Sequence, residues 1–226
     1  MYKKKYFEKI LSSKYLRYQD TGLVGYLMGS CHKNLENKFI KKNGNVLEIG
    51  PGTSPHIKYL KKGYDKYYFL ESSTFALNFL NKKFNKKNII IKKSIKNSVP
   101  FKKKFFDRII MSHVLEHISD PEKFLFKVMS KLKKGGYLSI SLPTDPGLLW
   151  RLGRSYNKIF NIKKKLNLNN CKYDYMIATE HVNSTFNLKS ILKYHFQKNI
   201  VCEDFLPFKF LKSLDFNLFY NLTIIK

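Results

Sequence analysis

The chain has 226 residues, of which 43% are hydrophobic and 15% aromatic, and its formal net charge is +27. This length fits one folded domain with appendages, and the apolar content excludes an intrinsically disordered chain. The 3 cysteines are widely spaced, which excludes a disulfide framework and a cysteine-rich metal site. We therefore expect a protein of a reducing, cytoplasmic compartment.

The positive charge comes almost entirely from lysine, because only Arg17, Arg108, Arg151 and Arg154 are arginines. Proteins that read bases favour arginine, and the lysines here are spread along the whole chain. A composition rich in Lys, Asn and Ile is also what an AT-rich coding sequence produces. We interpret most of the charge as a solvated surface, with a polyanion-binding surface as the alternative.

Residues 1–42 have helical spacing of apolar residues, interrupted by glycines, and predict an N-terminal helical appendage over 1–43. The lysine-rich start lacks the apolar core of a secretory signal. The weakly polar stretch 21–31 is too short to cross a bilayer. We expect at most peripheral membrane contact, and we expect His32 to be a surface or packing residue.

Residues 45–55 read NVLEIGPGTSP, a short apolar run that breaks into a glycine turn. This pattern is typical of a buried parallel strand that turns into a helix. Gly50 and Gly52 would let the backbone approach a ligand. The carboxylate of Glu48 suits an ammonium or hydroxyl group better than a pyrophosphate. The third glycine of the dinucleotide fingerprint is missing, which counts against a nicotinamide dehydrogenase.

Helices and strands alternate after this turn. Glu71 follows the second strand, 19 residues after Gly52, where an acidic residue can hold both hydroxyls of a ribose. The predicted elements are a helix over 54–62, a strand over 67–70, a helix over 74–84, strands over 88–91 and 105–111, a helix over 119–134 that stops at Gly135, and a strand over 137–142.

Residues 147–184 break the alternation and predict a cap insertion, placed at about 146–186. A helix over 188–196 precedes two strands, 200–205 and 216–225, whose connection is too short for a crossover helix, so they should pair antiparallel. The fold class predicted is α/β: a doubly wound, Rossmann-like, seven-stranded sheet, mostly parallel with an antiparallel C-terminal strand pair.

Several motifs in this order carry a family resemblance: VLEIGPG (46–52), Glu71, FDRIIMSHVLEH (106–117), Asp120-Pro121 and LKKGGYL (132–138). With them the chain resembles the class I S-adenosylmethionine-dependent methyltransferases, specifically the small-molecule group that shares the type 11 domain. The resemblance implies a methyltransferase domain over 44–226 and S-adenosylmethionine as the cofactor.

The resemblance also implies roles for residues at the strand ends. Glu48 and the backbone at Gly50 and Gly52 would hold the methionine part of the cofactor. Glu71 would hold its ribose, with Ser72 beside the adenine, and Ser112 and His113 would face the donor methyl group. Ser94 and Ile95 stand where an acidic residue often contacts adenine, so we expect backbone groups to recognise adenine there. The implied cofactor-binding set is Glu48, Gly50, Pro51, Gly52, Glu71, Ser72, Ser94, Ile95, Ser112 and His113.

An oxygen or nitrogen acceptor must also lose a proton, for which His113, His117, His181 and Asp145 are candidates. Together with Glu116, the three histidines resemble the metal site of small-RNA 2′-O-methyltransferases. We nevertheless expect no metal, because the same Glu-His pair is common in family members for which none is implied.

Trp150, Tyr173 and Tyr175 are candidates for an aromatic wall of the acceptor pocket, or else for packing within the cap. The section from Leu142 to Arg154 resembles a subgroup of bacterial methyltransferases, which implies a small-molecule, saccharide or lipid-linked acceptor. Two alternatives stay open: an RNA methyltransferase, favoured by the charge but not by the few arginines, and a non-catalytic cofactor-fold binding subunit.

Overall fold

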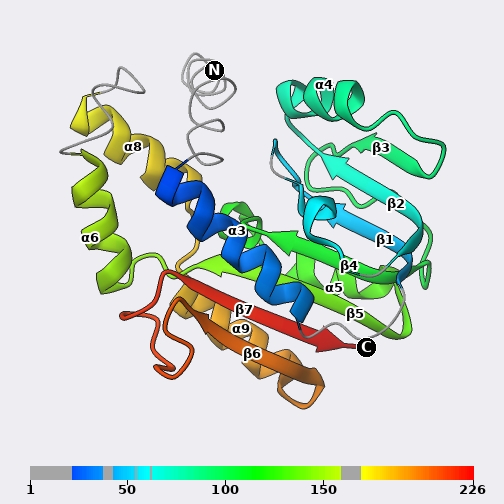
Figure 1. Cartoon of the computed structure of the whole chain (residues 1–226). Coiled ribbons are helices and arrows are strands. Elements are labelled where there is room, and N and C mark those ends of the chain that lie inside the picture. The colour runs from blue at the N-terminus through cyan, green and yellow to red at the C-terminus, as the bar shows by residue number, and fades with distance from the viewer. Residues whose placement is uncertain (1–21, 38–42, 54, 62, 159–168) are drawn as a thin grey trace.

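The computed structural model describes residues 22–37, 43–53, 55–61, 63–158 and 169–226. In this part of the chain seven strands form one sheet, in the order β3-β2-β1-β4-β5-β7-β6 (Figure 1). β7 runs antiparallel to β5 and β6, and the other neighbours pair in parallel. The predicted fold class is confirmed. The strands are β1 (Asn43–Ile49), β2 (Tyr64–Glu71), β3 (Ile89–Lys93), β4 (Phe106–Ser112), β5 (Leu132–Pro143), β6 (Ile200–Leu206) and β7 (Phe219–Ile225).

Helices cover both faces of the sheet. α5 and α9 bury their apolar sides against one face, while α3, α4 and the short helix η2 lie on the other (Figure 1). α6 and α8 stand beside the sheet, near the ends of β4 and β5. The helices are α3 (Gly22–Asn37), η2 (His56–Tyr59), α4 (Thr74–Lys83), η3 (Leu115–His117), α5 (Pro121–Lys131), α6 (Leu148–Asn157), α8 (Asn170–Glu180), α9 (Thr185–Phe196) and η5 (Gln197–Asn199).

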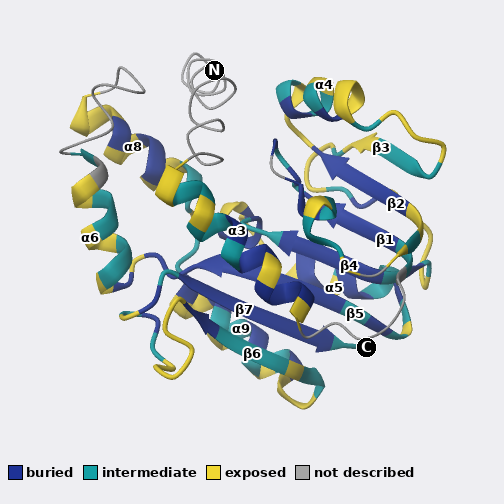
Figure 2. Ribbon diagram, in the orientation of Figure 1, coloured by how far each residue is buried: buried dark blue, intermediate teal, exposed yellow. Residues whose placement is uncertain are grey.

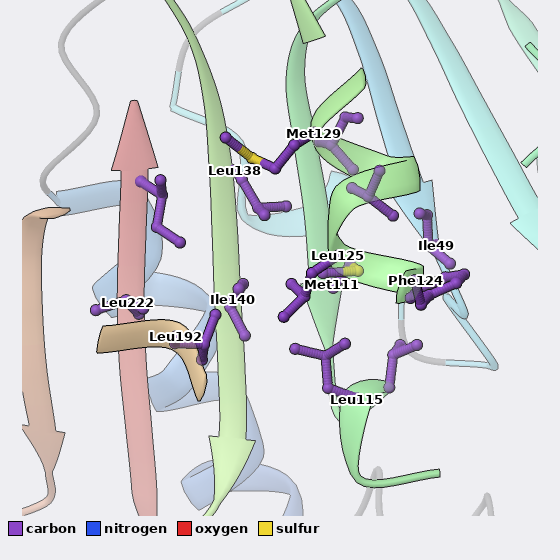
Figure 3. Packing of buried hydrophobic residues seen from close by; sticks show 14 of the residues in the cluster. Ile49, Met111, Leu115, Phe124, Leu125, Met129, Leu138, Ile140, Leu192 and Leu222 are labelled. Carbon is purple, nitrogen blue, oxygen red and sulfur yellow. The ribbon is translucent and has the colours of Figure 1, made fainter. Parts of the chain in front are cut away.

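The core follows the two-residue period of the strands. On β1, Leu47 and Ile49 face α5, whereas Val46 joins a smaller apolar cluster on the other face. Figure 3 shows the larger cluster, in which side chains of α5, such as Leu125, meet those of the central strands. Nearly all of these strand residues are buried (Figure 2), because helices cover the parallel sheet on both sides.

The helix predicted over 119–134 is shorter than expected, because α5 ends at Lys131 and β5 begins at Leu132. The glycine pair marks an irregularity inside β5: the register of β5 on β4 shifts between Phe106 and Arg108. A Cβ on Gly136 would lie 3.0 Å from the Lys133 carbonyl oxygen and 3.1 Å from that of Asp107. The glycine therefore allows a close backbone approach within a strand instead of ending a helix.

The helix predicted over 54–62 is also wrong in extent, since the structure has only the four-residue 3₁₀ turn η2 between the described residues 55 and 61. Carboxylates bind two backbone amides of this segment, of which that of Lys61 would bond internally in a helix over 54–62. His56 N donates to Glu48 Oε1 at 2.6 Å and Lys61 N to Glu36 Oε2 at 3.1 Å. Tertiary partners therefore override the local helical pattern.

α3 belongs to the predicted N-terminal helical segment and lies across β5 and β7 (Figure 1). Residues 1–21 and 38–42 of that segment, and residues 159–168 of the predicted cap, lie outside the described residues. The division of the chain at residue 43 stays a prediction. Within the described ranges, we find no helix with the length and apolar character needed to cross a membrane.

Candidate active site

The glycine turn follows β1 at the carboxyl end of the sheet. Gly50 and Gly52 have φ angles of +65° and +55°, a region that favours glycine. A Cβ on Gly50 would lie 2.8 Å from a methyl carbon of Val114. Pro51, between them, is buried. The turn after β1 thus lies close against the loop after β4, with no room for a side chain at Gly50.

Glu71 at the end of β2 folds across the glycine turn. Its Oε2 accepts a hydrogen bond from Gly52 N at 3.0 Å, and its Oε1 accepts from Ser72 N at 2.7 Å and Ser73 N at 2.8 Å. The turn and the predicted ribose carboxylate therefore come together although 19 residues separate them. Backbone amides hold this carboxylate in one orientation at the rim.

Glu48 lies deeper, at the inner side of the same turn, and is 2% exposed. Its carboxylate accepts hydrogen bonds from His56 N and from the Tyr67 hydroxyl, at 2.6 and 2.7 Å. Burial is the largest cause of its shift and, against the hydrogen bonds, raises the pKa of Glu48 to about 7. Glu48 thus supports the turn from inside; its contact with the cofactor's ammonium group stays a prediction.

The loop after β3 adjoins the Glu71 strand end. Ser94 N donates to the Glu71 carbonyl oxygen at 2.7 Å, and Ser94 Oγ donates to the Ser98 carbonyl at 3.0 Å. Ile95 is exposed and offers an apolar surface beside this strand end. Ser72 is exposed at the start of the neighbouring loop. The three residues assigned to the adenine side therefore lie on the loops that follow β2 and β3.

His113, directly after β4, has a φ angle of +56°, a strained value for a residue with a side chain. Its N–H donates to the Ser141 carbonyl at 2.9 Å, and its ring packs edge-on against Phe219 at 5.5 Å. Its Nε2 and the Ser112 hydroxyl are buried, without a hydrogen-bond partner in the described part of the chain. Two buried polar atoms at the end of β4 thus have unused hydrogen-bonding capacity.

Glu116, His117 and His181 form a second polar group above β4. One ligand atom from each lies within 4.8 Å of the others. The Glu116 side chain is 2% exposed, whereas that of His117 is 37% exposed. Burial would raise the pKa of Glu116, but His113, His117 and His181 together hold it below its usual range.

Both imidazoles of this group are anchored through Nδ1. His117 Nδ1 donates to the Glu180 carbonyl at 2.7 Å, and His181 Nδ1 donates to Asp145 Oδ2 at 2.8 Å. Asp145 is also ion-paired with Arg154 of α6. Because both acceptors are oxygens, each ring carries its proton on Nδ1. Its Nε2 then has a lone pair that these two hydrogen bonds do not use.

Backbone hydrogen bonds join the two segments that carry the group. Val182 N and Asn183 N both donate to the Glu116 carbonyl, at 2.9 and 3.1 Å. The Asn183 side chain donates to the carbonyls of Leu115 and Ile118. These contacts fix the link between α8 and α9 on η3 and bring together residues that the sequence separates by more than sixty positions.

The predicted aromatic wall is only partly assembled. Trp150 of α6 packs edge-on against Phe219 at 6.1 Å, and Phe219 also contacts His113. Tyr173 is buried within α8, whereas Tyr175 is exposed. Trp150 therefore lies near the candidate site, while the two tyrosines differ in environment and their role as an acceptor wall stays a prediction.

Sequence reasoning missed a buried polar network beneath the turn. Glu36 accepts hydrogen bonds from His56 Nε2 at 2.7 Å and from Arg108, and His32 Nδ1 lies 2.9 Å from His56 Nδ1. The expectation that His32 is a surface or packing residue is therefore refined: it is buried and hydrogen-bonded. An arginine in the middle of an apolar strand, Arg108, was the signal that could have revealed the network.

The chain is similar to known methyltransferases in sequence pattern and in structure. The sequence model of a family described as "Methyltransferase domain" matches residues 24–193. A methyltransferase structure from Aquifex aeolicus is 19% identical (TM-score 0.60, 93% of this chain and 96% of that chain covered). A possible histamine N-methyltransferase from Thermotoga maritima is 20% identical (0.63, 96% and 99%). The N-methyltransferase NodS from Bradyrhizobium japonicum, solved with S-adenosyl-L-homocysteine, is 13% identical (0.63, 96% and 94%). None of the curated proteins matches.

The sheet order, the glycine turn and the acidic residue after β2 define a class I S-adenosylmethionine-dependent methyltransferase. Because the match covers most of its length, the chain belongs to the methyltransferase-domain family, and S-adenosylmethionine is the cofactor. The description of the family does not separate the type 11 subgroup, so that narrower assignment stays a prediction.

Proposed function

We propose that this chain catalyses methyl transfer from S-adenosylmethionine to an oxygen or nitrogen of a small-molecule, saccharide or lipid-linked acceptor. The observation that carries the proposal is the Glu71 carboxylate, held at the rim by the amides of Gly52, Ser72 and Ser73. A carboxylate in this place can accept from both ribose hydroxyls. The methionine part would then lie along the turn, with the methyl group toward Ser112 and His113.

Methyl transfer requires little covalent help from the protein. The acceptor lone pair forms a bond to the methyl carbon while the carbon–sulfur bond breaks, and its electron pair stays on sulfur to give S-adenosylhomocysteine. Alignment of the three atoms supplies most of the rate. The acceptor proton leaves to a base, for which His113, His117, His181 and Asp145 are the candidates.

The histidine group supports a second route for removing that proton. Glu116, His117 and His181 have the donor types and the 4.8 Å spacing that a divalent cation could bridge. A cation there would bind an acceptor oxygen and lower its pKa. Activity that survives a chelator and is unchanged by added Mn²⁺, Co²⁺ or Zn²⁺ would favour a base; loss and recovery would favour the cation.

Two observations bear on the class of acceptor. The proposal includes nitrogen acceptors as well as oxygen acceptors because one of the similar structures is named as an N-methyltransferase and another as a possible one. An RNA acceptor is favoured only by the net charge of +27. Binding of RNA with a steep dependence on salt would support that alternative, while methylation of a neutral small acceptor would argue against it.

The proposal is tested by calorimetric titration of the full chain with S-adenosylmethionine. Replacing Glu71 with alanine should weaken binding roughly tenfold or more, because hydrogen bonds to a charged group contribute about 1.5–3 kcal/mol. The matched control is Glu122→Ala, an exposed carboxylate on α5 that pairs with His195; it should bind as the native chain does.

Glu71→Gln serves as a second variant. It keeps an acceptor for Gly52 N, so a loss of binding in this variant would not be due to a change in the conformation of the glycine turn. Equal binding by the native, Glu71→Ala and Glu71→Gln chains would contradict the placement of the ribose. Cofactor binding without any transfer, over a broad set of acceptors, would favour the non-catalytic binding subunit.

A further inference from the structure

α6 and the loop between β6 and β7 together expose an unusual number of large apolar side chains. On α6 these lie at positions i, i+4 and i+8, which places them on one face of the helix. The loop adds three phenylalanines and a leucine, with exposed fractions between 37% and 84%. We call this surface the apolar patch: Leu148, Leu152, Tyr156, Phe208, Phe210, Leu211 and Phe216.

The two parts of the apolar patch are joined. Leu149 N donates to the Asp215 carbonyl at 2.8 Å, and Leu148 N donates to Asp215 Oδ1 at 3.2 Å. Figure 1 shows the loop beside the beginning of α6, and Figure 2 shows exposed residues on both. The phenyl rings of Phe208 and Phe210 lie 6.1 Å apart at the tip. The two elements that carry the patch are therefore held together at the start of α6.

Basic residues outnumber acidic ones in the two segments that carry the apolar patch. Residues 147–158 contain no acidic residue, and residues 207–216 contain only Asp215. Arg151, Lys209 and Lys212 are exposed among the apolar side chains. Aromatic and aliphatic groups interspersed with cations are what the interface of an anionic bilayer favours: the apolar groups enter the acyl boundary and the cations meet the headgroups.

We propose that the apolar patch docks this protein onto the surface of an anionic membrane. The patch adjoins the candidate site, because α6 also carries Arg154, which is ion-paired with Asp145. β4 and β5 point toward the side of the molecule where α6 stands (Figure 1). Resting on the proposed methyltransferase function, the inference selects a lipid-linked acceptor, whose headgroup a docked molecule could reach.

The test is sedimentation of the full chain with vesicles of phosphatidylcholine alone, or of equal parts phosphatidylcholine and phosphatidylglycerol. We expect binding to the anionic vesicles, weakened by salt. The double variant Leu152→Ser with Phe210→Ser should lower the partition coefficient at least roughly tenfold, because it removes two side chains that would leave water. The control is Tyr194→Ser on α9, which is 85% exposed and outside the apolar patch; it should bind as the native chain does.

Three results would overturn the docking proposal. The native chain could fail to bind anionic vesicles, the double variant could bind as well as the control, or RNA could displace the native chain from the vesicles while the double variant fails to bind RNA. The last result would assign the surface to a nucleic acid. Because vesicles need no cofactor, these outcomes are separate from the calorimetric test with S-adenosylmethionine.

Discussion

At the scale of single residues, Glu48 shows how burial gives a motif residue an unusual chemistry. Its pKa is raised from 4.5 to about 7 because the carboxylate is buried, although His56 N and the Tyr67 hydroxyl donate to it. Between these values the folded chain binds a proton that the unfolded chain does not. The free energy of unfolding is therefore higher below about pH 4.5 and falls as the pH rises through about 7.

We predict that Glu48→Gln removes this part of the pH dependence. The shift corresponds to about 3 kcal/mol. Between pH 4.5 and 8 the free energy of unfolding should therefore fall by that amount less in the variant than in the native chain. Urea unfolding at several pH values measures the difference. Glu122→Gln, an exposed carboxylate, is the control and should follow the native curve. Parallel curves for Glu48→Gln and the native chain would show that Glu48 is ionised throughout.

At the scale of elements, α3 is bound to the sheet by polar contacts as well as apolar ones. Glu36 meets Arg108 of β4 and His56 of η2, and their interactions outweigh burial and hold the pKa of Glu36 at about 2. Burial lowers the pKa of His32 and of His56, so both rings are neutral. A neutral His56 donates from Nε2 to Glu36 and accepts at Nδ1 from His32.

We expect Glu36→Gln to lower the free energy of unfolding by roughly 3–5 kcal/mol, since it removes the negative charge that faces a buried guanidinium. Asp174→Asn, which breaks the exposed pair with Lys158, should cost at most about 1 kcal/mol. The double variant Glu36→Gln with Arg108→Met should lose less than the sum of the single losses. Equal costs for Glu36→Gln and Asp174→Asn in denaturant unfolding would mean that the network does not stabilise α3.

At the scale of the whole molecule, local patterns were enough for the sheet and for one side of the site. The alternation of apolar runs and turns predicts the mostly parallel sheet with its antiparallel C-terminal pair, and the 19-residue step from Gly52 predicts Glu71 at the rim. The same local patterns do not predict which side chains far apart in the sequence contact each other. Arg108 and Glu36 are 72 positions apart, and Asn34 and Asn221 are 187 apart. Such partners are decided by which faces pack together, a property that neither segment carries alone.

The most direct test of the account is hydrogen exchange of the full chain with and without S-adenosylhomocysteine. At about 100 times its Kd, the ligand should slow those openings that exclude it by about 100-fold. We predict protection in peptides that cover residues 48–53, 69–75 and 112–116, and unchanged exchange in β6. Protection confined to β6 and β7, or no protection anywhere, would contradict a cofactor site at the carboxyl ends of the strands.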